Sequence, residues 1–223
     1  MRSTARSEVG ILCVAGAVGL GIVSMLVPYV WGAFLPSSVP AGQESFYDSL
    51  HILWIPLSGL VLVAASAVLL GVGFLFVWRE RARVDPERRT LLGLATLAFA
   101  AAFAGAVLRT FLGLIVGLMY APDLRVLLFP VDVGLAIALG LSFYWVLLGI
   151  GVGQARFAGI VAIVAGSAGS FFHVLARATG IWDVNALAVA TGFLSLTLWL
   201  ALFLWGYEEV RLRGLSRPPG LPA

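Results

Sequence analysis

Two histidines in strongly apolar surroundings are the first candidates for chemistry. They are His51 and His173, and Gly169 lies one helical turn before the second. Two neutral imidazoles at equal depth on two helices can ligate a b-type haem iron from opposite faces. Gly169 would then leave space for the edge of the porphyrin. The pattern therefore predicts haem b, with His51 and His173 as iron ligands, or a quinol held between them. Each histidine is equally compatible with an interfacial residue that is hydrogen-bonded to a backbone carbonyl.

Two opposite charges, Arg109 and Asp132, also fall within apolar segments. A charge at the centre of a bilayer costs at least ~2.5–3.5 kcal/mol, so Arg109 should face the interior of a helix bundle and a partner. Asp132 is the natural partner. The two could bind an ionic solute, with Arg177 and Asp183 at the border of the same side. Alternatively, the pair only joins two helices, or Arg109 extends to the headgroup region.

Several other chemistries find no support in the sequence. All 14 basic residues are arginines, so no lysine is present for a retinal Schiff base. The chain has no His-Glu-x-x-His metal helix, no Cys-x-x-Cys pair and no phosphate-binding loop. The tract from Gly166 to Ser170 resembles a hydrolase motif only superficially and is more typical of helix packing. We therefore expect neither an autonomous hydrolase nor an ATPase.

The composition indicates that lipid surrounds most of the chain. Of the 223 residues, 61% are hydrophobic and 11% are charged, whereas soluble domains carry about 25% charged residues. Six apolar stretches are long enough to cross a bilayer of ~30 Å, at residues 9–35, 46–78, 91–120, 126–151, 157–176 and 185–207. The sequence therefore predicts an all-α membrane protein, a six-helix transmembrane bundle in which residues 1–223 form a single integral membrane domain.

The arginines predict the orientation of this bundle. Six spans place both termini on one side, and that side then carries 11 of the 14 arginines while the other parts carry 3, namely Arg109, Arg125 and Arg177. Arginine-rich loops face the cytoplasm, so both termini should be cytoplasmic in a multi-pass protein of the plasma membrane. His51, His173, Arg109 and Asp132 then share the outer half of the bundle.

Three hypotheses for function follow. The first is a redox or anchor subunit that holds haem b or a quinol near the outer face. The second is a solute transporter, or the substrate-capturing membrane subunit of one, with Arg109 and Asp132 in the binding site. The third is a structural subunit of a membrane complex without a ligand. In each case we expect contact with the lipid bilayer and with other membrane subunits or further copies of the chain. We expect no binding of nucleic acid, because the arginines lie where membrane topology would put them.

Overall fold

The computed structural model describes residues 4–34, 55–118, 128–153 and 155–215. In these ranges the chain is almost entirely helical and contains no strand. A short 3-10 turn, η2 (Arg81–Arg83), connects two of the long helices. The long helices are α1 (Thr4–Phe34), α3 (Ile55–Glu80), α4 (Pro86–Leu118), α5 (Phe129–Gly149), α6 (Ala155–Thr179) and α7 (Trp182–Leu215).

All six long helices are long and apolar enough to cross a membrane, which confirms the predicted transmembrane bundle. Several helix ends differ from the sequence prediction, mainly because polar residues extend the helices beyond their apolar segments. Helix α4 already begins at Pro86, where the proline suits the first turn and Glu87 complements the positive end of the helix. Helix α7 continues to Leu215, and the ion pair between Arg213 and Glu209 stabilises its last turns.

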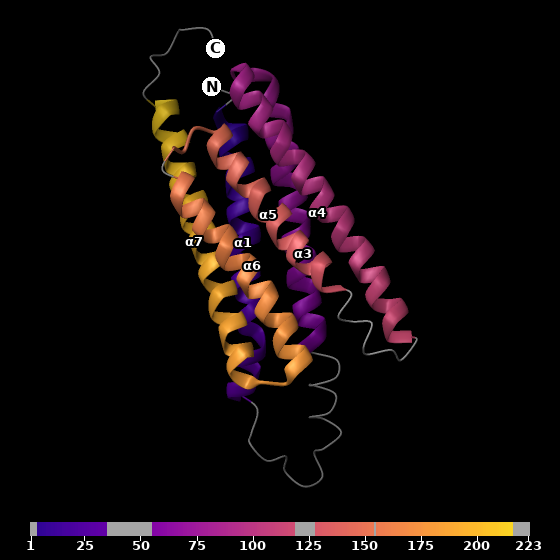
Figure 1. The fold of residues 1–223 in the computed structure, drawn as a ribbon. Coiled ribbons are helices and arrows are strands. Elements are labelled where there is room, and N and C mark those ends of the chain that lie inside the picture. The colour runs from indigo at the N-terminus through magenta and orange to yellow at the C-terminus, as the bar shows by residue number, and fades with distance from the viewer. Residues whose placement is uncertain (1–3, 35–54, 119–127, 154, 216–223) are drawn as a thin grey trace.

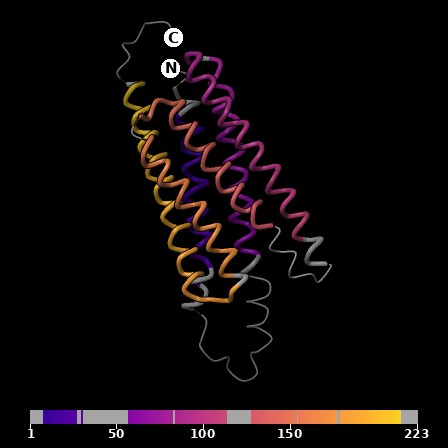
Figure 2. Tube along the Cα trace, viewed as in Figure 1, coloured from indigo at the N-terminus to yellow at the C-terminus, as the bar shows by residue number. Residues whose placement is uncertain are grey.

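Helices α5, α6, α7 and α1 each pack mainly on two neighbours, whereas α3 packs mainly on α1 and α4 mainly on α5 (Figure 1; Figure 2). The order around the bundle is α4, α5, α6, α7, α1 and α3. Helix α1 begins and α7 ends at the same end of the bundle (Figure 1). The first and last helices of this order, α4 and α3, touch only sparsely. Helix α4 diverges from α3 with increasing distance from the turn that connects them (Figure 1).

Small residues allow a close helix contact between α6 and α7. A Cβ atom at Gly169 would lie 3.0 Å from the backbone nitrogen of Gly192, so the two backbones touch there. One helical turn earlier on α6, Gly166 makes room for Ser195, whose hydroxyl donates a 2.7 Å hydrogen bond to the carbonyl of Ala162. The small tract of α6 therefore serves helix packing, as its composition predicts.

The turn between α5 and α6 is held by a side chain from the end of α7. Arg213 donates from Nη1 to the carbonyl of Ile150 (2.9 Å) and from Nη2 to the carbonyl of Gly151 (3.0 Å). The same Nη2 donates to Glu209 at 2.6 Å. Gly151 has a φ of +88°, a conformation that other residues rarely adopt. Arg213 thus links the last turn of α7 to the preceding helix pair.

Replacing Arg213 by glutamine should lower the free energy of unfolding by about 1 kcal/mol, because two charge-assisted hydrogen bonds to turn carbonyls are lost. Chemical unfolding in detergent micelles measures the change. Arg211→Gln is the matched control, since Arg211 makes only a 3.7 Å ion pair with Glu208 and both side chains are more than half exposed. Equal effects of the two substitutions would contradict the role assigned to Arg213.

Candidate functional site

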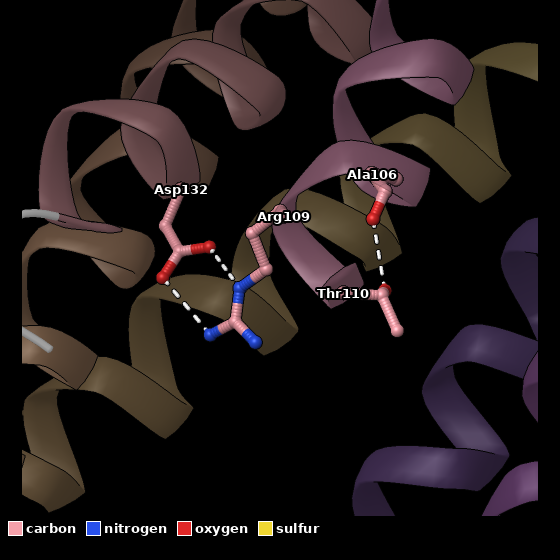
Figure 3. A network of polar contacts seen from close by, with 4 residues as sticks. All are labelled: Ala106, Arg109, Thr110 and Asp132. Carbon is pink, nitrogen blue, oxygen red and sulfur yellow. Dashed lines mark hydrogen bonds and ion pairs between the residues drawn. The ribbon is translucent and has the colours of Figure 1, made fainter. Parts of the chain in front are cut away.

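The centre of the candidate site is an ion pair between α4 and α5 (Figure 3). Arg109 donates from Nε to Oδ1 of Asp132 at 2.8 Å and from Nη2 to Oδ2 at 3.2 Å. Two parallel hydrogen bonds of this kind fix the relative orientation of the guanidinium and the carboxylate. Arg109 was expected to have a partner because a lone charge in the membrane is costly, and Asp132 is that partner.

Helix geometry explains how both side chains reach this level. Asp132 lies in the first turn of α5, two residues after Pro130, where the positive end of the helix dipole favours a carboxylate. Arg109 lies in the second half of α4, far from the arginine-rich connection at Arg81–Arg83. The pair therefore lies toward the end of the bundle that is opposite to the start of α1 and the end of α7 (Figure 1).

The ion pair borders a cavity that three helices share. Its volume is about 400 Å³. Its polar lining comes from the ion pair and from Ser170 and His173 of α6, and its apolar lining from Leu135, Ala136, Leu139 and Val174. The side chains of Arg109 and Asp132 are 34% and 23% exposed, so the polar part of the cavity can be reached from outside the protein.

Ser170 differs from the other helical hydroxyls near the site. Thr110 donates to the carbonyl of Ala106 at 2.9 Å (Figure 3), and Ser167 donates to the carbonyl of Ile163 at 2.8 Å. Such bonds to the preceding turn are the usual arrangement of a hydroxyl in a helix. Ser170 makes no hydrogen bond within the described part of the chain, although it lines the cavity. Its hydroxyl is therefore available to a molecule in the cavity.

Arg109 also keeps donors that Asp132 does not use. A guanidinium carries five N–H groups, and the two bonds to Asp132 occupy the edge formed by Nε and Nη2. The edge formed by Nη1 and Nη2 makes no hydrogen bond with another described residue. Nη1 lies beside Gly113, and a Cβ atom added there would be in van der Waals contact with it at 3.6 Å, so the glycine leaves no side chain against this nitrogen. The second edge can accept a planar anion while the first remains paired.

The remaining predicted site residues lie in different places. His173 lines the cavity together with the ion pair. His51 falls outside the described residues, so haem b between the two histidines stays a prediction. Gly169 faces Gly192 of α7, and the space left by its missing side chain is filled by that helix rather than left open for a porphyrin edge.

The other two predicted residues, Arg177 and Asp183, lie near the connection between α6 and α7. Arg177 belongs to the last turns of α6, and its side chain lies outside the described part. Asp183 is exposed in the first turn of α7 and is not among the residues that line the cavity. Within the described ranges, no group of three or more His, Cys, Asp or Glu side chains could hold a metal ion.

Sequence reasoning missed Ser170 as a cavity residue. The available signal was its spacing, since Ser170, His173 and Val174 recur at three and four residues and therefore share one face of α6.

Comparison with protein-family models, with curated proteins and with solved structures finds no match. The ion pair, the cavity and their chemistry are therefore the basis for inferring the function.

Proposed function

We propose that the protein handles a small ionic solute, as a transporter or as the substrate-capturing membrane subunit of one, and that the solute binds in the cavity beside Arg109 and Asp132. The observation that carries the proposal is the two-point ion pair at the wall of a cavity that also contains an unengaged serine hydroxyl. A pair that only joined two helices would need neither the cavity nor the hydroxyl.

The chemistry of the polar wall favours a solute with a carboxylate or a similar planar anion. The Nη1–Nη2 edge of Arg109 matches the two oxygens of a carboxylate, and such paired hydrogen bonds give geometric specificity. Asp132 holds the guanidinium in place, so little side-chain entropy is lost when the solute binds. The hydroxyl of Ser170 supplies one further donor.

The apolar wall restricts the rest of the solute. Leu135, Leu139 and Val174 line the cavity together with a small set of polar groups, which is the usual composition of a small-molecule site. A volume of about 400 Å³ is near the small end of such sites. The proposal is therefore a compact anion with an apolar body.

The distribution of arginines supports a position of this site on the outer side of the plasma membrane. The loops and ends on the side of the termini carry 11 of the 14 arginines, and such loops face the cytoplasm. The ion pair lies toward the opposite end of the bundle, so the cavity would collect its solute from outside the cell.

The test is thermal unfolding of the purified protein in the presence of a panel of small carboxylates and uncharged analogues. At least one carboxylate should raise the Tm, and Arg109→Gln should abolish that rise because the second guanidinium edge is lost. Ser170→Ala should weaken the binding by roughly five- to tenfold, as expected for one hydrogen bond to a charged group.

The matched control for the serine variant is Ser167→Ala, which removes a hydroxyl from the same helix. Ser167 donates to its own helix and does not line the cavity, so its loss should leave the solute response unchanged. The proposal fails if no carboxylate raises the Tm, or if the two serine variants behave alike.

A further inference from the structure

A second, larger cavity lies between α3 and α4, on the side of the bundle where these two helices diverge. Its volume is about 690 Å³. Its floor is the stacked pair of Phe74 and Phe99, whose ring centroids are 4.1 Å apart. Its walls include Val68 and Leu97, each 65% exposed. We call this cavity the α3–α4 groove.

The groove is apolar along its whole lining. Thr96 is the one described lining residue with a side-chain hydroxyl, and that hydroxyl donates to the carbonyls of Leu92 and Gly93 in its own helix. Trp78 is the lining residue closest in sequence to η2, and its indole N–H is the remaining side-chain donor. The body of an occupant therefore has to be hydrocarbon.

A positive charge lies at the Trp78 end of the groove. The guanidinium carbon of Arg81 lies over the indole of Trp78, 2.9 Å from the ring centroid. Within the described part of the chain, Arg81 forms no ion pair with a carboxylate. Arg79 is exposed in the last turn of α3, two residues before Arg81. This end of the groove therefore attracts an anion.

We propose that the α3–α4 groove binds an anionic phospholipid of the surrounding bilayer. Its acyl chain lies against Phe74, Phe99 and Leu97, and its phosphate pairs with Arg81 at the Trp78 end. Arginine clusters at the cytoplasmic ends of transmembrane helices recognise anionic headgroups, and tryptophan is enriched at this level of the membrane. The positive charge of Arg81 at the end of an otherwise apolar groove favours a lipid with an anionic headgroup over a purely apolar helix as the occupant.

The test is native mass spectrometry of the full chain after equilibration with phosphatidylglycerol or with phosphatidylcholine that has the same acyl chains. Phosphatidylglycerol should be retained preferentially. Arg81→Gln should lower that retention about fivefold, which corresponds to the contribution of one arginine near an anionic surface. Gly71→Leu should also lower it, because Gly71 lines the groove and an added Cβ atom meets no protein atom within 4 Å, so the new side chain can occupy the groove.

Each variant has a matched control. Arg156→Gln removes an exposed arginine at the start of α6, on the same arginine-rich side but outside the groove lining. Gly59→Leu makes the same substitution in α3 at a position that is equally open and does not line the groove. Both should retain phosphatidylglycerol like the wild type. Leu97→Trp, from the opposite wall, replaces Gly71→Leu if that variant does not fold.

Three results would overturn the proposal. The first is equal retention of the two lipids. The second is wild-type retention in the groove-filling variant or in Arg81→Gln. The third is a dimer that Gly71→Leu dissociates, which would assign the groove to a second copy of the chain.

Discussion

Asp132→Ala is expected to lower the free energy of unfolding by about 2 kcal/mol, because it leaves the guanidinium of Arg109 without its carboxylate in a lipid-embedded helix pair. The expected loss is below the ~2.5–3.5 kcal/mol cost of a charge at the bilayer centre, since the Arg109 side chain is 34% exposed. Unfolding in detergent or lipid measures the change. Arg109→Leu alone should have a smaller effect, because the Asp132 carboxylate that it leaves unpaired still interacts favourably with the positive end of the α5 helix dipole.

The double variant Arg109→Leu/Asp132→Leu separates a structural role from a binding role. Replacing both members of a partly buried ion pair by apolar residues is often neutral for stability. We therefore expect stability close to that of the wild type, with a coupling energy between the two sites of at least 1 kcal/mol. The carboxylate-dependent rise in Tm should nevertheless be absent.

Each alternative outcome has a clear meaning. A double variant that keeps the solute response would show that the pair only joins α4 to α5. Additive losses in the two single variants would show that the two-point contact contributes nothing to the helix pair. Thr110→Val controls for substitution beside Arg109, because Thr110 is exposed and bonds only to its own helix (Figure 3).

Gly169→Leu is expected to be the most disruptive single substitution at the site, with a loss of about 3 kcal/mol. A Cβ atom would lie 3.0 Å from the nitrogen and 3.2 Å from the Cα of Gly192, and backbone atoms cannot rotate away as a flexible side chain can. The two helices have to separate. Because Ser170 follows Gly169 directly and His173 lies one turn later, the separation should also weaken the solute response.

The control for this substitution is Gly59→Leu, since an added Cβ at Gly59 meets nothing within 4 Å. It should be neutral or stabilising by up to ~1 kcal/mol, the difference in helix propensity. Thermal unfolding of both variants, followed by circular dichroism, decides the matter. Wild-type stability in Gly169→Leu would mean that α6 and α7 do not touch at this position. Gly169 would then border an open space beside His173, as the sequence predicts.

The sequence by itself determined the class of the fold and the number of helices. Hydrocarbon as a solvent leaves few options, because every backbone polar group must be bonded within its own segment. Long apolar stretches such as residues 126–151 therefore had to become helices, as α5 did. Because a charge in hydrocarbon is costly, Arg109 was expected to have a partner and Asp132 to supply it, and the two hydrogen bonds between them confirm this pairing.

Only the tertiary structure decided which face of each helix meets which neighbour. In a helix that is apolar on every side, the sequence does not mark the inward face, since lipid and protein interior accept the same residues. Gly169 was therefore expected to border a cofactor but packs on Gly192, whereas Ser170, one residue later, faces the cavity. The sparse contact between α3 and α4, which leaves the groove open, likewise follows from the tilt of whole helices, and that tilt depends on contacts far apart in the chain.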